Sequence, residues 1–367
     1  MADGRIGKFI LCNEIKINKM RIAHIHWSLG TGGIETMLPD IVSEQAKTNE
    51  VALIIVNDWV EKSILAKVDK RVKVVLLNRH AGSKNPWPII KLNLFLMRFR
   101  PDIVHAHAYD EIKLVVYPFG KRVRTIHNTN NLVSPKEFPK FDKLISISKA
   151  VQDETMGQGF RNIKIDNGIP VARILYSKNI PFSDGKLHFI QVSRLDVEQK
   201  GQDILIKALD LVKHKFGFDN FVMHFVGRGN DEAMLKQMVH ELNLDQEIVF
   251  EGLKDQTWVY ENLCNFDLFI QPSRYEGFGL TVAEAIAAKV PVLVSNIEGP
   301  LEIIDGGRLG LSFENKDATD CANKIVDFIK QGRNEAQVEA AYQYVCDHYD
   351  VSVTARKYLE VYQSILK

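Results

Sequence analysis

The alternation of short β-branched runs with longer helical stretches constrains this chain more than any other feature. It repeats from Met20 onward, which is typical of strand–helix units in a parallel α/β sheet. In the first half the expected strands are residues 21–26, 51–56, 72–77, 102–106, 123–127, 143–147 and 162–166. In the second half they are residues 188–192, 222–226, 248–251, 268–270 and 292–295.

The same pattern divides the chain into two domains. Between residues 170 and 186 the periodicity lapses into a polar segment with Pro170, Pro181 and Gly185. A length of 367 residues also suits two domains of ordinary size. We therefore predict two doubly wound, Rossmann-like domains, residues 20–169 and 187–350, joined by a linker at 170–186.

Two terminal segments fall outside these units. Residues 1–19 precede a second methionine, Met20, and form an N-terminal extension of unknown role. Residues 351–367 are expected to form a C-terminal helix that can pack back on the N-terminal domain. Their apolar residues have helical spacing, at Tyr358, Val361, Tyr362 and Ile365.

Composition limits the class of protein and its compartment. Hydrophobic residues make up 46% and charged residues 25% of the chain, which is typical of a globular protein. No apolar run approaches the roughly 20 residues of a membrane-spanning helix, and no secretory signal is evident. The four cysteines are far apart and form no zinc spacing. We predict a cytoplasmic protein, with peripheral contact at the inner face of the membrane as an additional location.

The net charge of +1 hides an asymmetry between the two halves. Residues 1–185 carry 28 Lys and Arg against 18 Asp and Glu, a net charge of +10, whereas residues 186–367 carry 19 against 28, a net charge of −9. A basic half could face nucleic acid, an anionic substrate or an acidic membrane. Nucleic acid is disfavoured because the basic residues are scattered and lack zinc-finger or ribonucleoprotein motifs.

Residues 87–100 combine many large apolar side chains with Lys91, Arg98 and Arg100, and they allow two interpretations. One is a basic amphipathic helix that rests on an anionic membrane. The other is the buried crossover helix before the strand at 102–106. We favour the crossover helix.

Two glycine-rich or basic segments are candidates for binding an anion. Gly30-Thr31-Gly32-Gly33 follows the first strand and opens a helix, so backbone amides and the helix N-terminus can approach a phosphate there. A tight turn without a ligand is the alternative, and the spacing is not the G-x-G-x-x-G dinucleotide motif. In the second domain, Arg194 and Lys200 follow a strand and could neutralise a diphosphate, unless they are ordinary solvated charges.

Glu276 and Glu284 form the strongest constellation in the sequence. Glu276 lies in a loop that Gly277 and Gly279 open, and Glu284 lies about one turn inside the following helix. Carboxylates accept hydrogen bonds from vicinal sugar hydroxyls, and a helix N-terminus attracts phosphate. The pair therefore favours a nucleotide-sugar site over two unrelated surface acids.

Together these motifs resemble the retaining glycosyltransferases of family 4, glycosyl transferases group 1, which have the GT-B fold. The resemblance covers the chain from Met20 to its end and implies two Rossmann-like domains that face each other across a cleft. The matching landmarks, in chain order, are Gly32-Gly33, His105-Ala106-His107, Thr125-Ile126-His127-Asn128, Asn167-Gly168-Ile169, Ser193-Arg194-Leu195 with Lys200-Gly201, Gly227-Arg228-Gly229 and Glu276-x7-Glu284.

The resemblance also implies roles on the donor side of the cleft. Arg194 and Lys200 would hold the diphosphate, Glu284 the ribose hydroxyls and Glu276 the hydroxyls of the transferred sugar. Gly229 would border the base. The backbone amides that would support Glu276 belong to Phe278, Gly279 and Leu280.

On the acceptor side, His127 matches the family's cleft histidine and would approach the transferred sugar. Gly33 would let the N-terminal backbone close on the donor phosphate. The sequence departs from the family's usual pattern at Lys289-Val290, where a glycine is common, and at Asp166, where a proline is common. Both departures concern local loop geometry.

These implications define an expected activity. We expect a hexosyltransferase that moves a hexose or N-acetylhexosamine from a nucleoside diphosphate sugar, most simply a UDP-sugar, to a glycan or lipid-linked acceptor in surface polysaccharide biosynthesis. Retention would follow from front-face attack. The chain has no Asp-x-Asp motif, so we predict no metal and no cofactor. The alternatives are a nucleotide-sugar epimerase of similar fold and a catalytically silent nucleotide-sugar-binding partner subunit.

Overall fold

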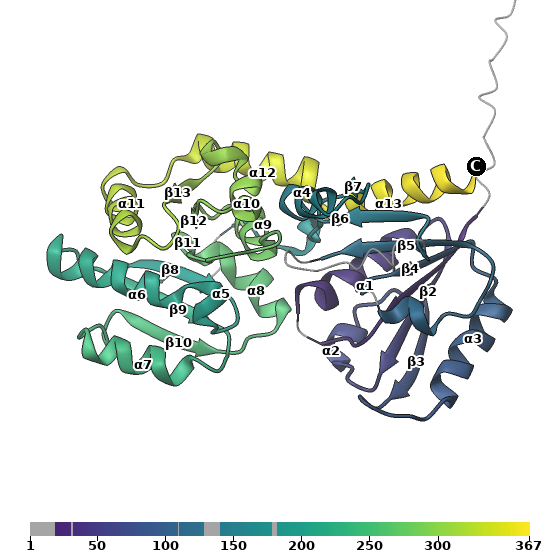
Figure 1. The fold of residues 1–367 in the computed structure, drawn as a ribbon. Helices are drawn as coiled ribbons and strands as arrows, with labels where there is room; N and C mark the ends of the chain where they lie inside the picture. The colour runs from purple at the N-terminus through teal and green to yellow at the C-terminus, as the bar shows by residue number, and fades with distance from the viewer. Residues whose placement is uncertain (1–18, 31, 109, 128–139, 178–181) are drawn as a thin grey trace, which may run out of the picture.

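The protein consists of two parallel α/β sheets in two lobes that lie side by side (Figure 1). The computed structural model describes residues 19–30, 32–108, 110–127, 140–177 and 182–367. Most of the N-terminal extension, all of residues 128–139 and residues 178–181 of the predicted linker therefore lie outside the described residues, as do Thr31 and Asn128 of the predicted motifs.

The N-terminal sheet has the strand order β3-β2-β1-β4-β5-β6-β7, and its described pairs are all parallel. Strand β4 is at its centre, with β1 beside it, and the strand order reverses between β1 and β4. In such a sheet the carboxyl ends of these central strands border the ligand site. The strands are β1 (Arg21–His26), β2 (Glu50–Asn57), β3 (Lys73–Arg79), β4 (Ile103–Ala106), β5 (Lys121–Ile126), β6 (Lys143–Ser146) and β7 (Ile163–Lys164).

The C-terminal sheet has the order β10-β9-β8-β11-β12-β13, again with parallel pairs. Its reversal point lies between β8 and β11. The strands are β8 (Leu187–Val192), β9 (Phe221–Val226), β10 (Ile248–Gly252), β11 (Leu268–Gln271), β12 (Val292–Ser295) and β13 (Leu311–Phe313).

Every strand expected from the sequence is present, with ends that differ by at most two residues. Strand β13 was not expected, because Leu311–Phe313 is short and polar at its centre. The two-domain GT-B arrangement expected from the resemblance agrees with these two sheets.

Helices cover both faces of the sheets. In the N-terminal half they are α1 (Gly33–Gln45), α2 (Lys62–Leu65), α3 (Trp87–Phe99) and α4 (Lys149–Gly157). In the C-terminal half they are α5 (Val197–Lys200), α6 (Gln202–Asp210), α7 (Glu232–Glu241), α8 (Gln256–Asn262), α9 (Leu280–Ala287), α10 (Glu298–Ile303), α11 (Ala318–Gln331), α12 (Glu335–Tyr349) and α13 (Val351–Leu366). None of the described helices combines the length and apolar character needed to cross a membrane.

Helix α13 returns to the N-terminal sheet, where it packs beside α1 (Figure 1). Its Tyr358 and Tyr362 are fully buried in the same core as the inner face of α1. Where the chain crosses back to the N-terminal domain, the start of α13 passes close to Gly168. An added Cβ at Gly168 would lie 2.7 Å from the Cα of Val351. A side chain there would push α13 away, so the crossing requires glycine.

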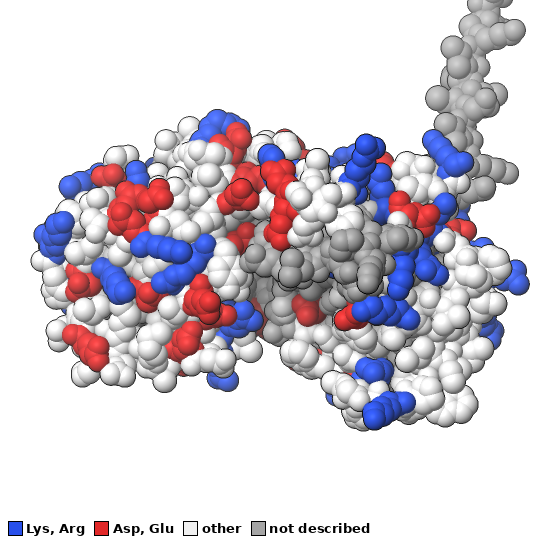
Figure 2. Space-filling view, in the orientation of Figure 1, with Lys and Arg blue, Asp and Glu red and all other residues white. Residues whose placement is uncertain are grey.

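Helix α3 is the crossover helix that we favoured, and it covers the sheet face opposite α1 and α13. Its Pro88, Leu92, Leu96 and Phe99 are buried. Its other face is exposed and apolar. In the space-filling view the part of the N-terminal domain where α3 lies is mostly white with scattered blue side chains, whereas red and blue are mixed over the C-terminal domain (Figure 2).

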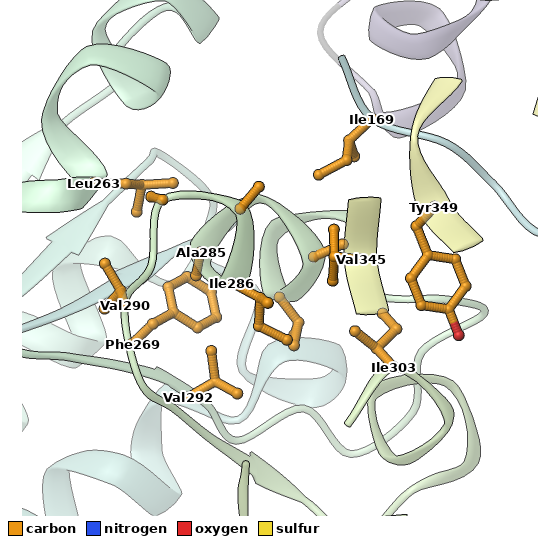
Figure 3. Packing of buried hydrophobic residues seen from close by; sticks show 14 of the residues in the cluster. Ile169, Leu263, Phe269, Ala285, Ile286, Val290, Val292, Ile303, Val345 and Tyr349 are labelled. Carbon is orange, nitrogen blue, oxygen red and sulfur yellow. The ribbon is translucent and has the colours of Figure 1, made fainter. Parts of the chain in front are cut away.

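The core beneath the predicted donor loop is formed by α9 and its neighbours (Figure 3). Helix α9 buries Val282, Ala283, Ala285 and Ile286 against β11, β12 and α12. Tyr349, at the end of α12, stands edge-on to Phe278 with ring centroids 5.3 Å apart. The first turn of α9 is thus held on a rigid base.

Candidate donor-binding cleft

The loop between β11 and α9 brings Glu276 to the carboxyl end of the C-terminal sheet. The backbone at Gly279 has a φ of 110°, a left-handed conformation that favours glycine, and it serves as the N-cap of α9. No side chain caps this helix, so its first amides are available to an anion. The Phe278 side chain is buried in the core beneath α9 and so holds the loop in place. Leu280 is the first residue of the helix.

Glu276 and Lys200 form an ion pair in which both side chains are largely buried. The same carboxylate oxygen of Glu276 accepts a hydrogen bond from Gln271 Nε2 at 3.1 Å. Lys200 ends the short helix α5, and Gln191 Nε2 binds its backbone carbonyl at 3.2 Å. The structure therefore joins two of the predicted donor residues, which lie 76 positions apart.

Glycines allow the loops around this pair to come close together. Gly201 has a φ of 66°, and an added Cβ would lie 2.1 Å from the carbonyl oxygen of Pro272. At Gly229 an added Cβ would lie 1.9 Å from the carbonyl oxygen of Leu195. Gly229 is thus required for packing on the segment that carries Arg194, whatever its part in binding a base.

Arg194 lies a few residues before Lys200, and its side chain is 63% exposed. Its guanidinium donates to Asp196 Oδ2 at 2.9 Å and to Gln199 Oε1 at 3.0 Å. These contacts hold the side chain next to α5 without burying it. An exposed guanidinium at this position can turn toward a phosphate with little desolvation.

Arg274 supports the Glu276 loop, a role that the sequence analysis did not assign to it. Its guanidinium forms a bidentate pair with Asp203, with both N–H···O distances 2.8 Å. It also donates to the carbonyl oxygen of Val197, and its own amide binds Gln199 O at 2.8 Å. Arg274 therefore fixes the Glu276 loop to the segment that carries Lys200. The sequence alone could not reveal this contact, because an Arg two residues before an acidic loop residue is a common pattern.

Glu284 lies apart from Glu276, on the buried side of α9. It is 8% exposed, and Tyr260 donates to its Oε1 at 3.3 Å. Burial raises its pKa to about 7, although the Tyr260 hydroxyl and the charge of Lys67 lower it. Lys67 belongs to the N-terminal half and binds Gln256 of α8, so this carboxyl faces the junction of the two domains.

Gly33 lies at the same junction. Its added Cβ would lie 3.0 Å from Leu280 Cδ1, which brings the first turn of α1 against the first turn of α9. The two helix N-termini thus approach each other from opposite domains. An ion pair between Arg173 of the linker and Asp40 of α1 lies nearby, and its charged atoms are 2.5 Å apart.

His127 follows β5 and is half-buried at the end of a chain of histidines. His107 Nδ1 lies 3.3 Å from His127 Nε2, and His24 Nδ1 lies 2.9 Å from His107 Nε2. The chain ends at Gln45, whose Oε1 lies 2.7 Å from His24 Nε2. Burial lowers the pKa of His24 to about 4 and that of His127 to about 3, and it holds the pKa of His107 well below its usual range.

This chain of neutral rings determines which nitrogen of His127 carries the proton. The Gln45 carbonyl can only accept, so His24 Nε2 donates and His24 Nδ1 accepts from His107. His107 Nδ1 is then left to accept from His127 Nε2. The Nδ1 atom of His127 therefore keeps its lone pair and can accept a hydrogen bond from a hydroxyl.

A charged histidine stands beside the neutral ones. Burial opposes a charge on His26, but its hydrogen bonds with Glu111 and Glu35 prevail and raise its pKa to about 9. Glu111 also accepts from the amides of His107 and Ala108, at 2.7 and 2.9 Å. Glu111 therefore fixes the loop after β4. The sequence analysis did not identify this role of Glu111.

Among the described residues, His24, His105 and His107 place ring nitrogens within 4.8 Å of one another, which is close enough for a metal ion. These nitrogens already have protein partners. His105 bonds with Tyr362 at 2.5 Å and Thr125 at 2.8 Å, and the other two bond with each other. The trio is better explained as a hydrogen-bonded support for His127.

The structure thus places the predicted residues in two groups. Lys200, Glu276 and the start of α9 form one, with Arg194 at its edge, and His127 belongs to the other. Within the described residues no hydrogen bond or ion pair links the two groups, so a ligand would have to connect them.

Two family models cover most of the chain and settle its family. Residues 31–173 match the model Glycosyltransferase Family 4, and residues 173–344 match Glycosyl transferases group 1. The chain belongs to the family 4, group 1 glycosyltransferases. This confirms the family expected from the motifs.

Curated relatives of this glycosyltransferase include enzymes with polysaccharide-related names. A glycogen synthase of Mycobacterium tuberculosis is 28% identical over 72% of this chain and 69% of its own length. The O-antigen biosynthesis glycosyltransferase WclY of Escherichia coli is also 28% identical, over 95% of this chain and 99% of its own.

Solved structures agree on the fold. A glycosyltransferase from Rickettsia africae has a TM-score of 0.79 at 22% identity and covers 95% of this chain and 99% of its own. Anabaena Alr3699/HepE, solved in complex with UDP and glucose, has a TM-score of 0.76 at 20% identity, over 94% and 100%. These similarities confirm the GT-B fold of the glycosyltransferase.

Proposed function

We propose that this glycosyltransferase moves a hexose or N-acetylhexosamine from a UDP-sugar to a glycan or lipid-linked acceptor in surface polysaccharide biosynthesis, with retention and without a metal. The observation that carries the proposal is the ion pair of Glu276 and Lys200 at the uncapped start of α9. The names of the relatives and the UDP bound in the HepE structure support the substrate class.

The donor would bind by separating this pair. Lys200 would pass from Glu276 to the β-phosphate, and Arg194 would turn inward to the same diphosphate. Glu276 would then be free to accept hydrogen bonds from hydroxyls of the transferred sugar. The positive charges of Lys200 and Arg194, together with the amides at the start of α9, would neutralise the diphosphate, as a divalent ion does in other transferases.

Glu284 would accept hydrogen bonds from the ribose hydroxyls. Because its pKa is about 7, the carboxyl can lose its proton near neutral pH at little cost and bind these hydroxyls as a carboxylate. His127 would accept a hydrogen bond from a hydroxyl of the transferred sugar at Nδ1, the nitrogen that the histidine chain leaves unprotonated.

The transfer itself would proceed on one face of the sugar. The acceptor oxygen attacks the anomeric carbon as its bond to the phosphate oxygen breaks. The acceptor proton passes to that departing oxygen, and the electron pair of the broken bond remains on the nucleoside diphosphate. The enzyme supplies orientation and stabilises the leaving diphosphate.

A donor panel tests this proposal. Thermal shift and nucleotide-release assays with UDP-, GDP- and ADP-sugars, with and without EDTA, should reveal stabilisation by UDP-sugars that EDTA does not change. Release of UDP on addition of glycan acceptors would identify turnover. Stabilisation that needs a divalent ion would contradict metal independence, and no stabilisation by any nucleotide sugar would contradict the donor site.

A further inference from the structure

Helix α3 presents an apolar face that the fold leaves uncovered. Its exposed residues are Trp87, Ile90, Leu94 and Met97, with relative exposures of 69%, 41%, 65% and 50%. Their spacing of three, four and three residues places them along one stripe of a helix about 20 Å long. The stripe is not needed for the fold, since other α3 residues face the sheet.

A neighbouring loop widens this stripe. Val116 is 76% exposed and Phe119 is 63% exposed. The Asn93 side chain fixes this loop to the middle of α3, because it donates to Leu114 O at 2.9 Å and accepts from the Val116 amide at 2.7 Å. We call the exposed residues of the helix and the loop together the α3 face.

Cations dominate the segment of the chain that contains α3. Residues 70–101 contain eight Lys and Arg and no Asp or Glu. Among them Lys84, Lys91, Arg98 and Arg100 are exposed, and none forms an ion pair with a carboxylate in the described part of the chain. An apolar stripe edged by unpaired cations is complementary to a surface with an apolar interior and anionic head groups.

We propose that the α3 face docks the enzyme on a membrane surface that contains anionic lipids. Trp87 would lie at the level of the head groups, with Leu94 and Met97 below it and the cations at the phosphates. A second copy of the chain is a poorer occupant, because two α3 faces in contact would bring like charges together. The proposal concerns a surface remote from the donor residues and does not depend on their roles.

Vesicle binding by the full-length protein tests this proposal without donor or acceptor. We expect co-sedimentation with vesicles of phosphatidylcholine and about 30 mol% phosphatidylglycerol, and little with phosphatidylcholine alone or at high salt. The variant Leu94→Glu with Met97→Glu should partition at least about tenfold more weakly. Met234→Glu is the matched control, because Met234 is 45% exposed on α7 of the other domain.

Tryptophan fluorescence locates the contact. The emission should shift to the blue when vesicles are added, and Trp87→Phe should remove most of this shift while leaving co-sedimentation largely intact. Circular dichroism of the double variant checks that its fold is unchanged.

Three results would overturn the proposal. The first is equal vesicle binding by the double variant and the wild type. The second is equal binding of the wild type to neutral and anionic vesicles. The third is a wild type that is a dimer in solution and a double variant that is a monomer, with neither protein binding vesicles. The last result would assign the α3 face to self-association.

Discussion

Replacing Glu284 by glutamine should change how the stability of the enzyme depends on pH. The carboxyl is almost fully buried in α9, and burial raises its pKa to about 7. Tyr260 donates to it, and glutamine can accept the same hydrogen bond at nearly the same volume. The substitution therefore removes the titration and little else.

The sign and magnitude follow from the two pKa values. In the unfolded chain the glutamate titrates near 4.5, so between about pH 4.5 and 7 the unfolded state loses this proton first. Ionisation therefore favours unfolding as pH rises through this window, and above it the effect is constant. From about pH 5 to about pH 8 the loss amounts to about 2 to 3 kcal/mol, at 1.36 kcal/mol for each pKa unit.

Urea unfolding of the wild type and Glu284→Gln at both pH values measures this difference. Relative to the wild type, the variant should gain about 2 to 3 kcal/mol of unfolding free energy on going from about pH 5 to about pH 8. Glu360→Gln, on the surface of α13, is the control and should gain nothing. A difference between Glu284→Gln and wild type that stays constant with pH would refute the buried, proton-binding carboxyl.

Other substitutions test the remaining parts of the site. Glu276→Ala should reduce transfer by about a hundredfold or more while circular dichroism stays unchanged, and normal turnover would remove Glu276 from the mechanism. Gly201→Ala should destabilise the protein by about 2 kcal/mol or more in thermal or urea unfolding, because its backbone is left-handed and its neighbour too close; a neutral effect would contradict that packing. Arg274→Ala should raise the KM for donor with a smaller effect on stability, since it frees the Glu276 loop; an unchanged KM would count against this clamp. Gln45→Leu should lower kcat about tenfold without changing UDP affinity, because His127 loses its fixed tautomer; an unchanged kcat would exclude that role.

Most of the strands could be predicted because each is a short apolar run, rich in β-branched residues, that is set apart from longer helical or polar segments. Strands β1 and β12 end where the sequence predicted, at His26 and Ser295. Strand β13 was missed because its three residues carry no such pattern. Pairing with β12 stabilises it, and that contact is not local in sequence.

The partly correct prediction for α3 shows a second limit. Periodicity identifies an apolar helix, but both stripes of α3 are apolar, so the pattern does not distinguish the stripe that faces the sheet. The structure shows that one stripe is buried as predicted and that the other remains exposed. Only the placement of the helix in the fold shows which stripe is buried and which is exposed.

The candidate site was predictable where chemistry is carried by residues close in sequence. Glu276 and the start of α9 belong to one segment. The supports of the site are long-range, as in the bidentate pair of Arg274 with Asp203 and the chain from Gln45 to His127. Such contacts depend on which strands adjoin in the sheet, and a single sequence does not reveal them.

The binding of UDP to the pair of Glu276 and Lys200 tests the central claim most directly. Calorimetric titration with UDP in the presence of EDTA should give a measurable affinity for the wild type and about tenfold or more weaker binding for Lys200→Met, which removes a charge-assisted bond and leaves Glu276 to repel the phosphate. Lys236→Met, a matched change on exposed α7, should bind like the wild type. Equal UDP affinity of Lys200→Met and the wild type would contradict the account.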